Sequence, residues 1–355
     1  MSQEIKLAHI SLAGRKHRER GLRCEDASLS VCKHGVSVVC LSDGAGGSQY
    51  THAEIGAKCI VKTITDLLTR HFDAFYYDNR ENLVRNIIIS AVQAEIAIKG
   101  NDKGNLRMEE LSATMMFCAV KDRRMICGHI GDGMIARVSG SGLSPITLPQ
   151  NGENASSTYF VTIRDAQNYL RIIRTTTDDT HAVVLMTDGV TDLVYDESKM
   201  LIMPVVARLA EIAVLQEADK QIKLSKTIRN YIVNASPVSD DASFGVLYFV
   251  GTPAPSIDML PAEKEIATRD FRDDMRAVQL EMLPRVQKAR AIVYSDNDET
   301  VAAKDEIAQV SDAIDSCERN SLAHEHKPCI SQTKRIKSNR ASANKMKSPA
   351  EADIV

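Results

Sequence analysis

The feature that most constrains this chain is an apolar run that stops at an aspartate followed by glycines. Residues 36–41 are typical of a β-strand, and the sequence Ser-Asp-Gly-Ala-Gly-Gly follows directly at 42–47. A helical stripe of apolar residues then runs over 50–71. Asp43 would therefore stand at the mouth of a sheet, where Gly44 and the next glycines let the backbone approach a bound ion or phosphate. The alternative is a plain strand-to-helix turn, for which aspartate and glycine are ordinary residues.

Acidic residues at strand ends recur further along the chain. Asp132 and Asp188 each follow an apolar run and precede a glycine, and Asp240 comes just before an apolar run. Together with the acidic pair Glu25 and Asp26, they are harder to explain as turns alone. Clustered carboxylates repel one another unless cations bind among them. All-oxygen clusters suit Mg²⁺ or Mn²⁺, and no His/Cys cluster has the spacing of a structural zinc site, so the sequence predicts a site for a hard divalent cation.

The order of the predicted elements favours antiparallel sheets. Strand patterns occur at 5–12, 27–32, 36–41, 113–120, 124–130, 134–138, 159–163, 181–187 and 243–250. Helical patterns occur at 50–71, 83–98, 199–217 and 218–233. Strands thus come in hairpins and helices in consecutive pairs, without the strict alternation of a parallel sheet. This order predicts a layered α+β domain.

The composition changes after residue 251. The sequence Thr-Pro-Ala-Pro at 252–255 is typical of a linker. We therefore predict a domain over 1–251, a charged and partly helical extension over 252–319, and a basic, disordered tail over 320–355. Pro284 is expected to interrupt the helical pattern of the extension. Within the tail, 327–347 holds seven Lys or Arg residues and no acid.

Charge and cysteine usage bear on partners and compartment. The net charge of −3 gives no bias towards nucleic acid or membrane, so only the basic tail offers a surface for an acidic partner or nucleic acid. The eight cysteines form no C-x-x-C pair, which fits a reducing compartment. Neither a signal peptide nor an apolar run long enough to span a bilayer is recognised, and we predict a cytoplasmic protein.

Five short motifs follow one another along the chain: Ser-Asp-Gly-Ala-Gly-Gly at 42–47, Ser-Ala-Thr at 112–114, Gly-His-Ile-Gly-Asp at 128–132, Thr-Asp-Gly-Val-Thr-Asp at 187–192 and Ser-Asp-Asp-Ala-Ser at 239–243. In type and order they resemble the motifs of the protein phosphatase 2C family, the metal-dependent Ser/Thr phosphatases. The segments Gly14-x-x-His17 and Gly21-x-x-Cys-Glu-Asp resemble the opening motif of a bacterial branch of that family. The resemblance covers about residues 5–250 and does not extend into the tail.

The resemblance implies a four-layer α-β-β-α sandwich of two mainly antiparallel sheets flanked by helix pairs. It also implies two Mn²⁺ or Mg²⁺ ions and a third, weaker one. The implied ligands are Asp43 as a bridge between two ions, the Gly44 carbonyl on one of them, Asp188 and Asp240 on the other, Glu25 and Asp26 through bound waters, and Asp132 on the third ion.

The function implied by the resemblance is hydrolysis of phosphoserine and phosphothreonine in proteins by a metal-activated water. Its partners would be phosphorylated proteins in signalling, namely a Ser/Thr kinase or its targets. One alternative is a pseudophosphatase or adaptor that binds a kinase or phosphoprotein without hydrolysis, and another is hydrolysis of a small phosphate ester. Retention of Asp43, Asp188 and Asp240 favours catalysis, because an adaptor needs none of them. No Cys-x5-Arg run is present, which disfavours a cysteine-nucleophile phosphatase.

The arginine that commonly holds the phosphate in this family is missing at its usual position. Gly21 stands there, with Arg20 before it and Arg23 after it. Either guanidinium could bind a phosphate in a bidentate manner. The alternative is that both belong, with Arg15 and Arg18, to a solvated face.

Overall fold

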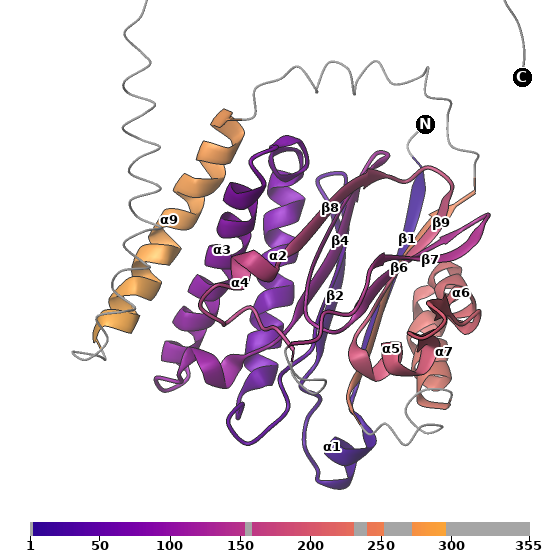
Figure 1. The fold of residues 1–355 in the computed structure, drawn as a ribbon, viewed down its shortest axis with the longest axis horizontal. Helices are drawn as coiled ribbons and strands as arrows, with labels where there is room; N and C mark the ends of the chain where they lie inside the picture. Colours follow the sequence, from indigo (N-terminus) through magenta and orange to yellow (C-terminus); the bar gives the residue numbers. More distant parts are fainter. Residues whose placement is uncertain (1–2, 153–157, 231–239, 252–271, 296–355) are drawn as a thin grey trace, which may run out of the picture. The chain divides into compact units, whose positions relative to one another are not determined.

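The computed structural model describes residues 3–152, 158–230, 240–251 and 272–295, and two five-stranded sheets form its centre (Figure 1). The first sheet has the order β1 (Glu4–Leu12), β12 (Ala242–Val250), β9 (Thr180–Met186), β6 (Met134–Ser139), β7 (Gly142–Thr147). The second has the order β2 (Ala27–Lys33), β3 (Val36–Ser42), β4 (Met115–Lys121), β5 (Arg124–Ile130), β8 (Arg171–Thr176). All neighbouring strands in these two sheets pair antiparallel.

Helices cover the outer face of each sheet, so the predicted α-β-β-α sandwich is confirmed. On the second sheet lie α2 (Ala53–Tyr77) and α3 (Glu81–Asp102), with α9 (Arg272–Ser295) packed on α3. On the first sheet lie α5 (Asp188–Val194), α6 (Val205–Ala210) and α7 (Glu217–Ile228). The shorter elements are α1 (Arg15–Glu19), η1 (Met108–Leu111), α4 (Ala166–Tyr169), η2 (Glu211–Val214) and the hairpin of β10 (Tyr195–Asp196) with β11 (Leu201–Ile202).

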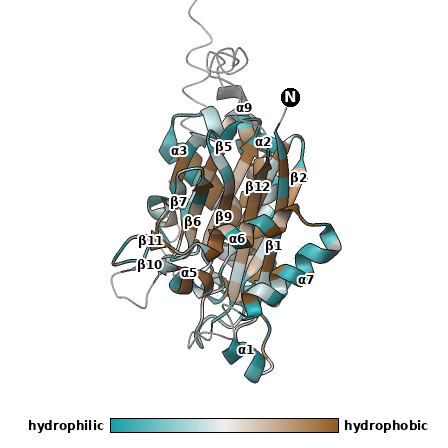
Figure 2. Cartoon of the chain, turned by 90° about the vertical axis from the view of Figure 1, so that its right-hand side faces the viewer, coloured by the Kyte–Doolittle hydropathy of each residue, from teal (hydrophilic) through white to brown (hydrophobic). Residues whose placement is uncertain are grey.

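Strand β3 is apolar along its length because both of its faces are buried. Val38 and Cys40 belong to the core under α2 and α3, whereas Val39 and Leu41 belong to the core between the sheets. Successive side chains of a strand point to opposite faces, so a central strand of a sandwich needs apolar residues on both. A third core joins the first sheet to α5, α6 and α7. The brown strands in the middle of Figure 2 show this burial.

Some predicted elements were wrong. The run 159–163 is no strand: Val161 donates to the Ala113 carbonyl, and Gln93 of α3 donates to the carbonyls of Val161 and Ile163, so no partner strand is needed. Strands β7 and β8 were missed because their polar residues hide the alternation. The helix predicted over 199–217 is broken into β11, α6 and η2, and 231–233 lie outside the described residues.

The predicted extension contains α9, which runs through Pro284 instead of ending there. Val278 and Met282 of α9 are buried against α3 and α2 and belong to the same hydrophobic cluster, and this packing offsets the hydrogen bond that a proline removes. Glu281 pairs with His71 at 2.6 Å, where α2 is kinked. The boundary at 251 remains a prediction, and the basic tail over 320–355 lies outside the described residues.

Candidate metal centre

Asp43 follows the last residue of β3, and the start of β4 fixes its backbone. The Asp43 N–H donates to Thr114 Oγ1 at 3.0 Å, and the Thr114 N–H donates to the Asp43 carbonyl at 2.8 Å. Ser42 Oγ donates to the Thr114 carbonyl at 2.6 Å. The Ser-Asp-Gly and Ser-Ala-Thr motifs are therefore two sides of one short backbone junction.

Gly44 is required by a close approach of two chain segments. A Cβ atom at this position would lie 2.6 Å from the Glu25 carbonyl oxygen, which is closer than real Cβ contacts. At Gly46, two residues further on, an added Cβ would meet nothing within 4 Å. The glycine at 44 thus lets the segment that carries Glu25 and Asp26 lie directly against the Asp43 turn.

Three of the predicted carboxylates come together at one end of the sandwich. Asp43, Asp132 and Asp188 each offer an oxygen atom, and these atoms lie within 4.8 Å of one another. Asp43 and Asp132 follow β3 and β5 of one sheet, whereas Asp188 follows β9 of the other. Within the described ranges, this is the group of acidic, histidine or cysteine side chains whose spacing suits a metal ion. Its members are far apart in sequence and meet because the two sheets pack face to face.

Asp26 is buried beside this group, with an exposed fraction of 4%. Its Oδ2 accepts a hydrogen bond from Thr187 Oγ1 at 3.0 Å, while Oδ1 is buried without a partner among the described residues. Burial, and then the charge of Asp241, raise the pKa of Asp26 to about 8. A buried acceptor without a donor is costly unless something else binds it.

The pKa values of the other carboxylates are raised as well. Burial is the main cause at Asp188, whose pKa rises to about 7, with further contributions from the charges of Asp132 and Asp240. The pKa of Asp43 lies well above its usual range because of burial and the neighbouring charges of Asp26 and Asp188. Bound cations would remove this repulsion, and an all-carboxylate set is the donor set that Mg²⁺ and Mn²⁺ prefer. The residues present therefore fit a divalent metal centre.

Asp240 borders the group, whereas its neighbour Asp241 has a different environment. Asp240 is exposed, and its charge raises the pKa of Asp188 and Asp132. Asp241 is 2% exposed, and its carboxylate accepts the N–H of Gly14 at 2.7 Å and the N–H of Glu25 at 2.5 Å. Residue-type reasoning selected Asp240 and missed Asp241, although the Asp-Asp pair at the start of β12 was the available signal.

Two further residues approach Asp132 and Asp188. The Thr158 side chain forms a hydrogen bond with Asp132, which lowers the pKa of that carboxyl against the raising effect of burial. The charge of Asp192, one helical turn after Asp188 in α5, raises the pKa values of both Asp132 and Asp188. Asp192 belongs to a motif quoted from the sequence, but no role was predicted for it.

The predicted phosphate-binding arginines lie outside the acidic group. Arg20 and Arg23 are both exposed, in the segment that links α1 to Glu25. In the part of the chain that the structure describes, neither guanidinium forms a side-chain hydrogen bond or an ion pair.

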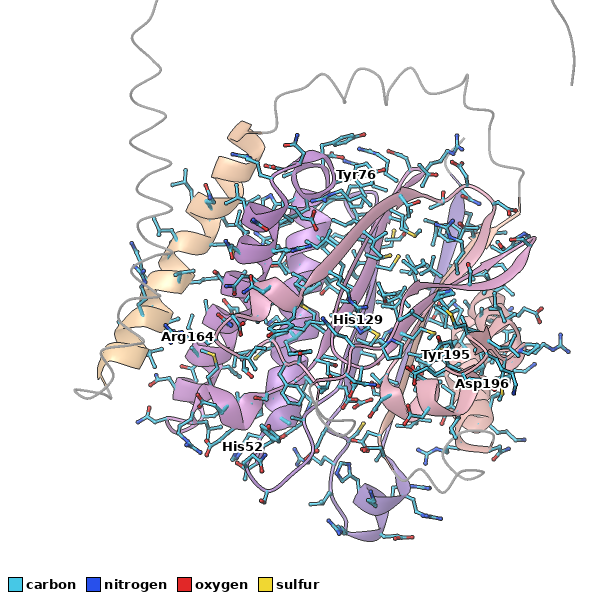
Figure 3. All side chains as sticks on the ribbon, in the orientation of Figure 1. His52, Tyr76, His129, Arg164, Tyr195 and Asp196 are labelled. Carbon is cyan, nitrogen blue, oxygen red and sulfur yellow. The ribbon has the colours of Figure 1, made fainter. Side chains whose placement is uncertain are left out.

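Among the histidines, His17 Nε2 lies 3.6 Å from Glu25 Oε2, and His52 lies at the periphery near the start of α2 (Figure 3).

His129, in the Gly-His-Ile-Gly-Asp motif, lies between the sheets and not at the surface (Figure 3). Its Nδ1 lies 2.8 Å from Thr147 Oγ1 and 2.8 Å from Arg171 Nη2. Burial, followed by the charge of Arg171, holds the pKa of His129 well below its usual range. The neutral imidazole therefore joins β5 to β7 and β8 from inside the motif that carries Asp132.

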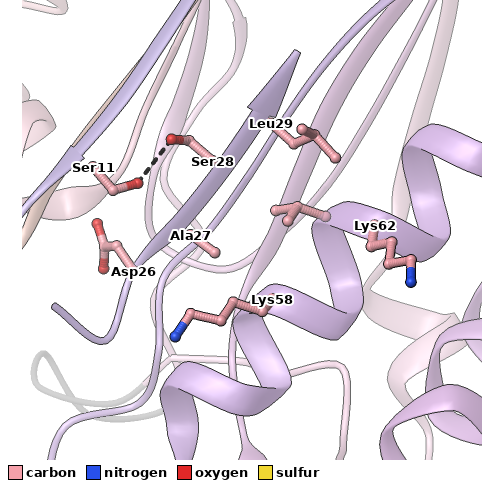
Figure 4. A pocket seen from close by; sticks show the side chains of 8 residues that line it. Ser11, Asp26, Ala27, Ser28, Leu29, Lys58 and Lys62 are labelled. Carbon is pink, nitrogen blue, oxygen red and sulfur yellow. Dashed lines mark hydrogen bonds between the residues drawn. The ribbon is translucent and has the colours of Figure 1, made fainter. Parts of the chain in front are cut away.

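A pocket of about 400 Å³ adjoins the centre through Asp26 (Figure 4). Ser11 and Ser28, joined by a 2.9 Å hydrogen bond, line one side, and Lys58 of α2 lines the other. The pocket lies between the edge of the sheets and α2, so it reaches the buried carboxylate from the helical side.

Comparisons with known proteins agree with these motifs. The family model described as protein phosphatase 2C matches residues 13–228. A Ser/Thr protein phosphatase 3 from Escherichia coli (strain K12) is 24% identical over 190 residues, which cover 52% of this chain and 73% of that protein. The structure of a bacterial serine phosphatase covers 71% of this chain and 100% of its own, with 15% identity and a TM-score of 0.50. A point variant of a bacterial serine phosphatase gives 14% identity, the same coverage and a TM-score of 0.51.

Proposed function

Because the chain belongs to the protein phosphatase 2C family, we propose that it hydrolyses phosphoserine and phosphothreonine monoesters in proteins. The observation that supports this most directly is the convergence of Asp43, Asp132 and Asp188, with oxygen atoms within 4.8 Å of one another. Phosphoryl transfer depends mainly on positioning and on neutralising charge, and a carboxylate cluster is suited to hold the cations that do this.

The proposed cofactors are two Mn²⁺ or Mg²⁺ ions, with a third site of lower affinity. When bound, such ions acidify a water molecule and neutralise phosphoryl oxygens. The residues that would hold these ions are Asp43, the Gly44 carbonyl, Asp188 and Asp240, with Glu25 and Asp26 acting through water. Asp132, with Asp192 nearby, would hold the ion at the third site.

The remaining residues keep these ligands in place. Thr114 fixes the backbone of Asp43, and Thr187 donates to Asp26. Gly44 keeps a side chain out of the space against Glu25.

Arg20 or Arg23 is proposed to bind the substrate phosphate, since a guanidinium forms two parallel hydrogen bonds with phosphate oxygens. The reaction is direct attack of water on phosphorus, without a covalent phosphoenzyme.

The proposed partners are phosphorylated proteins, namely a Ser/Thr kinase or its targets. An adaptor that binds phosphoproteins without hydrolysing them would have no need for three carboxylates with raised pKa values in one place. No helix in the described part of the chain has the length and apolar character needed to cross a membrane.

The test is hydrolysis of a phosphothreonine peptide by the full chain, with Mn²⁺ or Mg²⁺ and after chelation. We expect phosphate release that depends on the added metal, and no labelled protein when a radiolabelled peptide reaction is quenched in acid. Release that persists after chelation would contradict the metal dependence. A trapped phosphoprotein would contradict direct attack, and binding without release would favour the adaptor.

A further inference from the structure

Residues 15–23, here called the basic arm, connect β1 to Glu25 and include α1. Five of these nine residues are Arg or Lys and one is Glu, which gives a formal charge of +4 with His17 neutral. The cations are Arg15, Lys16, Arg18, Arg20 and Arg23. The whole chain has a net charge of −3, so the positive charge of the arm is a local feature.

The basic arm is exposed and lies where the carboxylates gather. All five of its cations are exposed, and α1 contributes no buried residue to any core. Figure 1 shows α1 projecting beyond the lower ends of both sheets, at the end where α5 begins with Asp188. Figure 2 shows the same helix in the hydrophilic colour, away from the apolar strands. A role in packing therefore does not explain the arm.

A buried carboxylate holds both ends of the basic arm. Asp241 Oδ1 accepts the N–H of Gly14, just before the arm, at 2.7 Å, and Oδ2 accepts the N–H of Glu25, just after it, at 2.5 Å. The same Oδ1 lies 2.8 Å from His17 Nδ1 within the arm. A helix of five residues is not stable alone, so these contacts are what fix α1 beside the centre.

This anchoring sets the distance between the positive charges and the carboxylates. Glu25 follows the arm after Cys24, and its carbonyl oxygen lies against Gly44, next to Asp43. The arm is thus joined through Glu25 to the turn that carries Asp43. Exposed charges act over about 10 Å at moderate ionic strength, which covers several residues on either side of the phosphorylated one.

We propose that the basic arm binds acidic residues that flank the phosphorylated serine or threonine of a protein substrate. This inference rests on the proposed phosphatase function and specifies its substrate class. Arg15, Lys16 and Arg18 lie on α1, further along the chain from Glu25 than Arg23, and they contact the polypeptide and not the reacting phosphate. The preferred substrates are phosphoproteins with aspartate, glutamate or a second phosphorylated residue near the cleaved ester.

The experiment compares two phosphothreonine peptides that differ only in flanking residues, Asp and Glu in one and Asn and Gln in the other. Their kcat/KM values are measured, and the affinities of the matching phosphonate analogues, which are not hydrolysed, are measured by fluorescence anisotropy. Several exposed ion pairs of ordinary strength should favour the acidic peptide about tenfold at low salt, with less preference as salt rises.

The preference for the acidic peptide is then compared between a variant of the basic arm and a control variant with substitutions outside it. The triple variant Arg15→Gln, Lys16→Gln, Arg18→Gln should reduce the preference to less than about twofold, mainly through KM and the anisotropy affinity. The control removes three exposed cations elsewhere, through Lys33→Gln, Lys223→Gln and Lys226→Gln, and should keep the preference.

Each outcome decides a different question. The inference would be overturned if the wild type bound both peptides equally and hydrolysed them with equal kcat/KM. It would also be overturned if the two triple variants lost the preference for the acidic peptide to the same extent. Neither result would contradict the phosphatase activity. A preference in anisotropy without hydrolysis of either peptide would support the arm and contradict the proposed function. If an oligonucleotide displaces the acidic peptide and binds the arm more tightly, the arm is a nucleic-acid site and the inference is wrong.

Discussion

Asp241 Oδ2 accepts the backbone N–H of Glu25 at 2.5 Å, which joins the start of β12 to a residue 216 positions earlier. This contact connects the last predicted motif of the chain to the first. Because the Glu25 carbonyl lies against Gly44, the hydrogen bond also determines how the Glu25–Asp26 segment meets the Asp43 turn. Three acidic segments, at 25–26, 43–44 and 240–241, are thereby positioned relative to each other by contacts between protein atoms.

Asp241→Ala is expected to lower the free energy of unfolding by about 3 kcal/mol, because two N–H groups lose their acceptor in a buried place. Asp241→Asn keeps one acceptor oxygen and should cost about 1 kcal/mol. Urea unfolding of both variants measures the difference. An alanine variant as stable as the wild type would show that the contact does not anchor the segment.

Gly44→Ala should cost about 2 kcal/mol of stability, since the new methyl group would overlap the Glu25 carbonyl. It should also weaken Mn²⁺ binding, because the carbonyl and the Asp43 turn must move apart. Gly46→Ala is the matched control, with open space around its Cβ. Thermal unfolding and Mn²⁺ titration check both variants, and similar behaviour of the two would refute the close-approach argument.

The metal-free protein should lose stability as the pH rises from about 4 to about 8. In the folded state the pKa values of Asp26 and Asp188 are raised to about 8 and about 7 from a usual value of 3.8, so over this range the folded state holds protons that the unfolded state has lost. Mn²⁺ competes with these protons and should stabilise the protein more at pH 8 than at pH 6. Melting temperatures with and without chelator test this, and a metal-free protein whose stability rises over the range would contradict it.

Met282→Ala should reduce the free energy of unfolding by about 3 kcal/mol, because its side chain is buried in the hydrophobic cluster that α9 forms with α3 and α2. Leu280→Ala on the same helix is the control, since Leu280 is 54% exposed. Denaturant titration distinguishes the two. Equal small effects would mean that α9 does not contribute to the stability of the catalytic fold.

Sequence patterns predicted the elements that are buried on regular faces. The run at 36–41 predicts β3 because both faces of that strand are apolar, and the stripes at 50–71 and 83–98 predict α2 and α3. Strand β8 escaped prediction because Arg171 and Arg174 interrupt its pattern, and Arg174 instead donates to the carbonyls of Phe75 and Asp78. Tertiary hydrogen bonds of this kind have no local signal.

The candidate centre could be predicted only in part for the same reason. Asp43, Asp132 and Asp188 share a visible context, an apolar run before and a glycine after, and the structure brings their oxygen atoms together. The role of Asp241 depends on Gly14 and Glu25, which are distant in sequence, so residue type could not distinguish it from Asp240. The positions of Arg20 and Arg23 depend on how the basic arm folds between Gly14 and Glu25, which sequence patterns do not indicate.

The measurement that tests the central claim most directly is Mn²⁺-dependent hydrolysis of a phosphothreonine peptide by Asp43→Asn. Loss of a proposed ligand for the cations that assist phosphoryl transfer should lower kcat/KM by about a thousandfold. Asp196→Asn is the matched control, because Asp196 lies in the β10–β11 hairpin and pairs with Lys199 at the surface, and it should retain wild-type activity. Wild-type activity in Asp43→Asn, or equal losses in the two variants, would contradict the assignment of Asp43 to a catalytic metal centre.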